Sequence, residues 1–250
     1  MLGRFFSRRT FFRASTAAAT TAAVSQFLTE TAEAQATKIA PGSTILFQGD
    51  SITDCGRNKK QNAANVARAF GTGYPLLIAS KLMADHPAAK LSTFNRGISG
   101  HKVPDLDKRW DKDCIDLKPD ILSILVGVND IWHKLNGNYD GTVESYETGL
   151  HALLERTRKA LPDTRIVICE PFALRCGAVN DKWFPEMDER RAACKRVSDK
   201  MKCTWVPFQS MFDKATNDDA PANYWAGDGV HPSMAGHALM AKTWLETVMS

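Results

Sequence analysis

The sequence predicts an α/β protein, folded as a three-layer α/β/α sandwich around a five-stranded parallel sheet. Short runs of β-branched and apolar residues alternate with longer segments of helical apolar spacing. One of the short runs, residues 121–126, is apolar at nearly every position, which is typical of a strand covered on both faces, as in parallel sheets. Five strands that alternate with helices favour a single sandwich.

Each expected element follows from its pattern. The expected strands are Thr44–Gln48, Leu91–Asn95, Ile121–Val126, Arg165–Cys169 and Thr204–Pro207. The expected helices include Tyr74–Asp85, Val143–Ala160, Met187–Met201 and a last helix on which Met240, Trp244, Leu245 and Val248 share one face. The polar segment Gly56–Gly73 is bounded by glycines, and we expect it to be a surface loop near the functional site. In such sheets reactive groups gather at the carboxyl ends of the strands.

Residues 1–36 are typical of an export signal. Basic residues come first, an uncharged stretch rich in Ala and Thr follows from Ala14 to Leu28, and the segment ends in the A-x-A pattern Ala34-Gln35-Ala36. Ser7-Arg8-Arg9-Thr10-Phe11-Phe12 is similar to the twin-arginine signal of bacteria, which exports folded proteins. The alternative is an amphipathic helix on a cytosolic protein. We predict a periplasmic or extracellular protein without stable membrane insertion, with its functional domain in residues 37–250.

Composition and charge exclude several classes of protein. The chain has 250 residues, of which 44% are hydrophobic and 24% charged, and this is too apolar for a disordered protein. Its net charge of +4 falls to +2 once residues 1–36 are removed with their four arginines and two glutamates. Since no basic stripe with interleaved aromatic residues is present, nucleic acid is not an expected partner. The sequence leaves the oligomeric state open.

The six cysteines do not form a metal or redox motif. None of them makes a CxxC pair, so neither a zinc ribbon nor a thioredoxin-type site is indicated. Cys169 falls in an apolar strand and is expected in the core. A disulfide between Cys176 and either Cys194 or Cys203 stays open, because export permits disulfides without requiring them.

Three sequence blocks follow expected strands, and each alone has an ordinary structural explanation. In Gly49-Asp50-Ser51-Ile52-Thr53-Asp54 the serine can expose its hydroxyl at the sheet edge, but Ser51 and Asp54 are also spaced as a helix capping box. In Asn95-Arg96-Gly97-Ile98-Ser99-Gly100 the glycines let backbone N–H groups approach a ligand, or simply form a turn. In Gly127-Val128-Asn129-Asp130 the Asn129 amide can donate hydrogen bonds at the same edge, or the segment can be a loop with a helix cap.

The fourth block is Asp228-Gly229-Val230-His231-Pro232. Pro232 keeps His231 out of helical conformation, so we expect a bent loop before the last helix. Such a loop can fold the Asp228 carboxylate onto one imidazole nitrogen and leave the other to act as a base. Alternatively, Asp228 and His231 can be two metal ligands.

Taken together, the four blocks resemble the GDSL, or SGNH, family of serine hydrolases, and the resemblance covers residues 44–248. It implies a flavodoxin-like fold and no metal or organic cofactor. It also assigns roles: Ser51 as nucleophile, His231 as base and Asp228 as its orienting carboxylate. The N–H groups of Ser51 and Gly100 and the amide of Asn129 form the oxyanion hole. The first block here reads Gly-Asp-Ser-Ile instead of Gly-Asp-Ser-Leu, which keeps the reactive positions.

Residues next to the blocks are candidates for substrate binding: His101, Trp132, His133 and Trp225. Asp50 and Asp54 are expected to hold the first turn, and His237, in the last helix, is not expected to be the base. The function expected is hydrolysis of small acyl esters, acetyl foremost, through an acyl-enzyme, with carbohydrate esters among the candidate substrates. The alternatives are a lysophospholipase or thioesterase of the same family, a metal-dependent phosphoesterase that uses Asp50, Asp54, Asp228 and His231, and a non-catalytic carbohydrate-binding module.

Overall fold

The computed structural model describes residues 39–250. The predicted export signal, residues 1–36, lies outside the described residues. Within them, no helix combines the length and the apolar character needed to cross a membrane.

The core of the fold is one parallel sheet with the strand order β2-β1-β3-β4-β5. The strands are β1 (Thr44–Gly49), β2 (Ser92–Asn95), β3 (Ile121–Leu125), β4 (Arg165–Cys169) and β5 (Thr204–Val206). All four neighbouring pairs are parallel. The predicted fold is therefore confirmed, and every expected strand is present with ends that differ by one residue at most.

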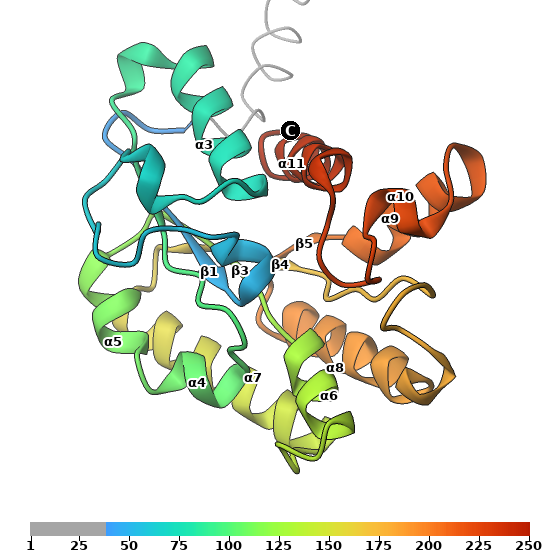
Figure 1. The fold of residues 1–250 in the computed structure, drawn as a ribbon. Helices are drawn as coiled ribbons and strands as arrows, with labels where there is room; N and C mark the ends of the chain where they lie inside the picture. The colour runs from blue at the N-terminus through green and yellow to red at the C-terminus, as the bar shows by residue number, and fades with distance from the viewer. Residues whose placement is uncertain (1–38) are drawn as a thin grey trace, which may run out of the picture. The chain divides into compact units, whose positions relative to one another are not determined.

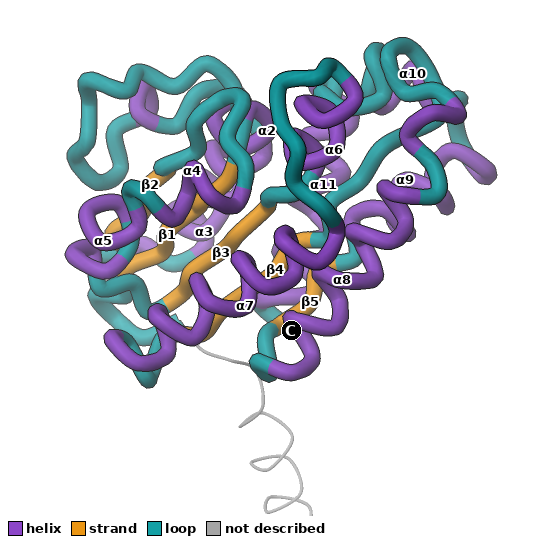
Figure 2. The backbone as a smooth tube through the Cα atoms, turned by 90° about the horizontal axis from the view of Figure 1, so that it is seen from below, coloured by secondary structure: helices purple, strands orange, loops and turns teal. Residues whose placement is uncertain are grey.

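Helices cover both faces of the sheet. The described α-helices are α2 (Ser51–Asp54), α3 (Tyr74–Asp85), α4 (Val103–Asp107), α5 (Trp110–Asp113), α6 (Val128–Leu135), α7 (Val143–Ala160), α8 (Glu186–Lys200), α9 (Phe208–Asp218), α10 (Ala222–Trp225) and α11 (Met234–Val248). Figure 1 shows α3 and α11 on one face, and α4, α5, α7 and α8 on the other. Figure 2 shows the strands side by side between these layers.

Alternation along β1 divides the apolar side chains between two cores. Ile45 and Phe47 belong to the core under α3 and α11, whereas Leu46 belongs to the core under α7 and α8. All three side chains are fully buried. This two-sided burial explains why the central strands are apolar at almost every position.

Successive strands are added on opposite sides of β1, although all of them run parallel. β2 lies on one side of β1, and β3, which follows β2 in sequence, lies on the other. The last residues of the two strands, Gly49 and Leu125, are partners in the sheet register. The loops that leave β1 and β3 therefore diverge at this edge, which is where ligands bind in open α/β sheets.

Candidate active site

Ser51 occupies the first position of α2, directly after β1. The N-cap is Asp50, whose Oδ1 accepts a hydrogen bond from the Ile52 N–H at 3.0 Å. The expectation that Ser51 itself could cap this helix with Asp54 is therefore wrong. Because Asp50 takes over the capping, the Ser51 hydroxyl is available for another partner.

Gly49 leaves no room for a side chain at the turn before Ser51. A Cβ at this position would lie 2.4 Å from the Leu125 carbonyl oxygen and 2.4 Å from Thr53 Oγ1. The close approach of β1 to β3 at this point requires glycine, and it brings the loop that carries Ser51 against the loop that follows β3.

Three side chains from two distant parts of the chain form a continuous line of hydrogen bonds. Ser51 Oγ lies 2.8 Å from His231 Nε2, and His231 Nδ1 lies 2.6 Å from Asp228 Oδ2. Because a carboxylate only accepts hydrogen bonds, the proton of the neutral imidazole is on Nδ1, and Nε2 accepts from the Ser51 hydroxyl. This arrangement has a nucleophile, a base and a group that orients the base.

Asp228 is held in its ionised form by several donors. Its Oδ1 accepts the backbone N–H groups of Val230 at 2.9 Å and His231 at 2.7 Å. Partial burial alone would raise the pKa of Asp228, but the hydrogen bonds from the His231 ring and from these two N–H groups outweigh burial and lower it. The carboxylate therefore stays available to hold the imidazole.

The loop that carries Asp228 and His231 is fastened to the segment after β4. The N–H of Leu174 donates to Gly229 O at 2.8 Å, and the N–H of Ala178 donates to Asp228 O at 2.9 Å. Gly229 has φ +86°, and a Cβ there would lie 2.4 Å from the Leu174 carbonyl oxygen. A left-handed glycine thus allows the bend that the sequence predicts before α11.

The two other blocks come to the same edge of the sheet. Gly100, with φ +80°, lies in the loop after β2, and Asn129 is the second residue of α6. Asn129 Nδ2 donates to His101 O at 3.3 Å, which leaves its second N–H for another acceptor. Both residues line a cavity of about 330 Å³ together with Ser51 and His231. An oxyanion at this cavity would meet donors from both loops.

Of the four residues expected to bind substrate, two line this cavity and two do not. Trp132 and His133 line the cavity, and the Trp132 ring lies 5.8 Å from the His231 ring between centroids. His101 and Trp225 are not among the lining residues. The His101 ring instead accepts a hydrogen bond from Arg109 Nε, and Trp225 Nε1 donates to Ala220 O.

Two further residues line the cavity that the sequence did not single out, Ser99 and Asn136. Asn136 follows Trp132 by four positions, so the helical spacing of α6 could have indicated that they share a face. Ser99 lies within the second block, but the direction of its side chain depends on Asp54. The N–H and the hydroxyl of Ser99 both donate to Asp54 Oδ2 at 2.9 Å.

Asp50 and Asp54 serve the backbone around Ser51, as expected. Burial raises the pKa of Asp50 to about 7, and its Oδ2 has no hydrogen-bond partner among the described residues. Burial alone would also raise the pKa of Asp54, but hydrogen bonds from Lys59 and Ser99 outweigh it and lower this pKa. Of the four side chains named for the metal-dependent alternative, Asp228 and His231 pair with each other, whereas Asp50 and Asp54 bind other groups. Residues 39–250 contain no group of three or more ligating side chains arranged for a metal ion.

Two further expectations concern the cysteines and His237. All six cysteines, which lie within the described residues, are free, so the disulfide that the sequence left open is not formed. Cys169 is buried in β4, as predicted. His237 is buried too, and its Nδ1 accepts the Tyr74 N–H at 3.2 Å.

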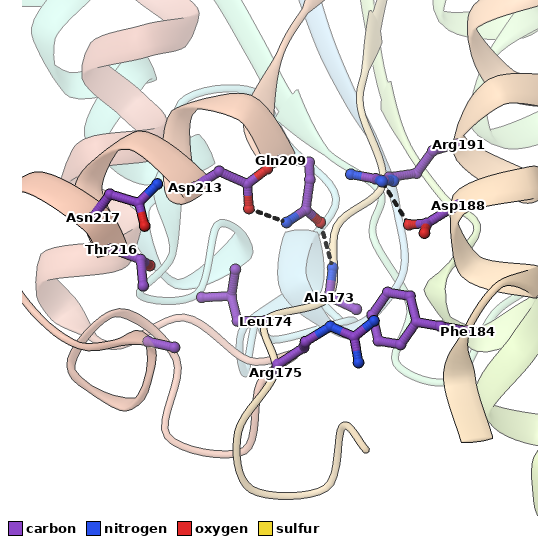
Figure 3. A pocket seen from close by; sticks show the side chains of 11 residues that line it. Ala173, Leu174, Arg175, Phe184, Asp188, Arg191, Gln209, Asp213, Thr216 and Asn217 are labelled. Atoms are coloured by element: carbon purple, nitrogen blue, oxygen red, sulfur yellow. Dashed lines mark hydrogen bonds and ion pairs between the residues drawn. The ribbon is translucent and has the colours of Figure 1, made fainter. Parts of the chain in front are cut away.

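A larger cavity, of about 510 Å³, lies between α8 and α9 and contains none of the predicted site residues (Figure 3). Several of its polar side chains are engaged in hydrogen bonds or ion pairs. Gln209 accepts the Ala173 N–H at 2.9 Å and donates to Asp213 at 2.8 Å, and Arg191 donates to Asp188 at 2.6 Å.

Comparisons with known proteins show the family to which the chain belongs. A sequence profile of the GDSL-like lipase/acylhydrolase family matches residues 47–239. The chain belongs to this family. An acetylxylan esterase from Geobacillus stearothermophilus is 34% identical over 215 residues, which cover 84% of this chain and 96% of that protein. The chain is thus a carboxylic ester hydrolase.

Solved structures of family members are similar over most of their length. A GDSL-like lipase from Parabacteroides merdae is 48% identical with a TM-score of 0.82, over 85% of this chain and 99% of that chain. The crystal structure of the Geobacillus esterase is 33% identical with a TM-score of 0.75, over 84% of this chain and 96% of that chain. Two of its variants, in which an Asp and a His three positions apart are each replaced by Ala, are described as catalytic mutants.

Proposed function

We propose that this protein is an exported serine esterase that removes small acyl groups, acetyl foremost, from carbohydrate esters. The observation that carries the proposal is the line from Ser51 through His231 to Asp228, with distances of 2.8 and 2.6 Å. A serine hydroxyl is a poor nucleophile at neutral pH, and an imidazole acceptor in direct contact with it supplies the base that it needs.

In the first half of the reaction, His231 Nε2 takes the proton of Ser51 as Oγ attacks the ester carbonyl carbon. Asp228 keeps the imidazole in the reactive tautomer and stabilises the imidazolium that forms. The carbonyl oxygen becomes an oxyanion, which accepts hydrogen bonds from the N–H groups of Ser51 and Gly100 and from the amide of Asn129.

Collapse of this intermediate breaks the bond to the alcohol. His231 returns its proton to the leaving alkoxide, and the acyl group stays on Ser51 Oγ. Water then enters, gives a proton to His231 Nε2 and attacks the acyl carbon. The second intermediate releases the carboxylic acid, and the proton goes back to Ser51.

The walls of the cavity support a sugar ester as substrate. Trp132 offers an aromatic surface beside His231, and His133 and Asn136 add polar groups. Aromatic and hydrogen-bonding groups together suit the apolar faces and the hydroxyls of a sugar ring. The Geobacillus relative, described as an acetylxylan esterase with catalytic Asp and His residues three positions apart, supports the same assignment for Asp228 and His231.

A substrate series tests the proposal. We expect the protein to release acetate from acetylated xylo-oligosaccharides and to hydrolyse p-nitrophenyl acetate faster than the octanoate, without loss of rate in a chelator. Ser51→Ala should abolish both activities and keep the thermal midpoint. A preference for long acyl chains would favour the lysophospholipase or thioesterase alternative. Activity that survives in folded Ser51→Ala would contradict the serine mechanism.

Export is a separate part of the proposal and rests on residues 1–36. Fusing this segment to a reporter that folds before export should send the reporter out of a bacterial cytoplasm. Replacing Arg8 and Arg9 by lysine should block this, because the twin-arginine pathway depends on the pair. A reporter that stays in the cytoplasm with the intact segment would overturn the export assignment and leave the esterase assignment untouched.

A further inference from the structure

We infer that Arg109 is a positioning residue of the oxyanion hole, whose guanidinium fixes the loops that carry Ser51, Gly100 and Asn129 relative to one another. This inference rests on the proposed function, because it concerns the same site. It assigns Arg109 a role in the rate of acyl transfer and no contact with substrate.

The guanidinium reaches three acceptors at two places, the end of β1 and the loop that follows β2. Nε donates to the His101 ring at Nδ1 over 3.2 Å, Nη1 donates to Arg96 O over 2.8 Å, and Nη2 donates to Gly49 O over 3.4 Å. Gly49 ends β1, Arg96 directly follows β2, and His101 directly follows Gly100. One planar group with several fixed donors can hold both segments at once, whereas a lysine ammonium cannot reproduce that geometry.

Asp113, one turn further along, holds the guanidinium in place. Its Oδ2 accepts from Arg109 Nη1 at 3.0 Å, and its backbone carbonyl accepts from Gln48 Nε2 at 2.8 Å, which ties α5 to β1. The side chains of Arg109 and Asp113 are only 13% and 19% exposed. A charge in this position needs such a partner, since an unpaired buried charge is strongly destabilising.

The contacts of Arg109 lead directly to the groups that would bind the oxyanion. The His101 carbonyl accepts the hydrogen bond from Asn129 Nδ2 at 3.3 Å, so the residue whose ring Arg109 holds also aims the Asn129 amide. On the other side, Gly49 O accepts from both Arg109 and the Ile98 N–H, the latter at 3.1 Å. The Gly49 carbonyl therefore joins the segment that leads to Ser51, the turn that leads to Gly100 and the Arg109 side chain.

Arg109 also fixes the state of the His101 ring. An arginine N–H only donates, so His101 Nδ1 must accept and the ring proton must be on Nε2. Burial and the positive charge of Arg109 both lower the pKa of His101, which keeps the ring neutral. The bond between the two side chains is thus maintained, and this explains why His101 is turned to Arg109 instead of lining the cavity.

Loss of this anchor should affect the transition state more than substrate binding. The oxyanion forms only during the reaction, so a displaced donor lowers kcat while KM changes little. Displacements of about 1 Å in a catalytic arrangement can cost roughly 10²-fold in rate. A residue that merely stabilises the fold would lower the thermal midpoint without this selective loss of kcat.

The test compares Arg109→Ala and Arg109→Lys with Arg156→Ala, using p-nitrophenyl acetate and an acetylated xylo-oligosaccharide. Arg156 is a matched control because its Nη2 donates to Asp107 O at 3.1 Å, and so it fastens the α4–α5 segment from the outside without reaching the site loops. We expect kcat to fall roughly 10²-fold in Arg109→Ala with KM within about threefold, a smaller fall in Arg109→Lys, and wild-type kcat in Arg156→Ala. Guanidinium at low millimolar concentration should restore part of the rate of Arg109→Ala alone.

A double-mutant cycle with Asn129→Ala decides whether Arg109 acts through the oxyanion hole. If it does, the effects of Arg109→Lys and Asn129→Ala on kcat will be less than additive, because both remove the same stabilisation. Additive effects, a wild-type kcat in folded Arg109→Lys, or an equal loss in Arg156→Ala would each overturn the inference. None of these outcomes touches the proposed serine mechanism, which fails if folded Ser51→Ala keeps its activity.

Discussion

Ser51 Oγ and His231 Nε2 lie 2.8 Å apart, although 180 positions separate the two residues in the chain. The contact is possible because β1 delivers Ser51 to the edge of the sheet, and the segment after β4 holds the loop of His231 above it. Neither element alone would bring a base to the serine. The chemistry of the site therefore depends on the assembled sheet.

Asn129→Ala should lower kcat by roughly 10²–10³, the loss typical of one oxyanion donor, with little change in KM. The alanine removes the only side-chain donor among the three groups that would bind the oxyanion. Steady-state kinetics on p-nitrophenyl acetate measures this effect. Asn138→Ala, in the exposed loop after α6, serves as control and should keep the wild-type kcat. A loss below a few-fold in Asn129→Ala would remove Asn129 from this role.

Trp132→Ala should weaken binding of the sugar part of the substrate. The ring lines the cavity beside His231, so its loss should raise KM for an acetylated xylo-oligosaccharide more than KM for p-nitrophenyl acetate. Trp225→Phe should leave both values unchanged, because Trp225 does not line the cavity. Equal changes in the two substrates would show that Trp132 packs against the catalytic loop without binding sugar.

His237 should make the protein less stable in acid. Burial, with a smaller contribution from the positive charge of His231, lowers the pKa of His237 to about 4 from its usual 6.5. Above pH 6.5 the ring is neutral in both states, but as the pH falls towards 4 the unfolded chain takes up a proton that the folded chain does not. Folding free energy is then lost, by up to about 3 kcal/mol. Urea unfolding between pH 7 and 4 should show a smaller loss in His237→Asn, and parallel curves would contradict this.

Asp50 should have the opposite pH dependence. Burial raises its pKa to about 7 from 3.8, so between these values the unfolded chain loses a proton that the folded chain keeps. The stability of the folded state should therefore fall as the pH rises from about 4 to about 7. Asp50→Asn keeps an acceptor for the Ile52 N–H, so relative to the wild type it should be more stable at pH 8 than at pH 4. Urea midpoints at the two pH values check this, and a constant difference would rule out a neutral Asp50.

The strands and the four chemical blocks could be predicted from sequence because each depends on local pattern. Residues 121–126 are apolar at every position but Ser123. Ser51 and Asn129 each come shortly after a strand, and His231 directly precedes the proline that bends its loop. The direction of side chains in the loops could not be predicted in the same way. His101 and Trp225 are close to the blocks in sequence, yet the first is turned away by Arg109 and the second by its bond to Ala220 O.

The roles of Asp50 and Arg109 show the same limit. Ser51 and Asp54 fit a capping box equally well in sequence, and only the fold shows that Asp50 caps α2 instead. Arg109 carries no motif, because its acceptors at Gly49, Arg96 and His101 come together only after β1 and β2 pair. Any residue type can supply a backbone carbonyl. Acceptors of this kind that are distant in sequence therefore leave no sequence pattern that predicts the contact.

Mass spectrometry of the intact protein after treatment with a serine-directed fluorophosphonate tests the central claim most directly. We predict one adduct per chain, located on Ser51 by peptide mapping, with labelling strongly slowed in folded His231→Ala and absent in folded Ser51→Ala. An adduct on another residue, or labelling of His231→Ala at the wild-type rate, would contradict a nucleophile at Ser51 activated by His231.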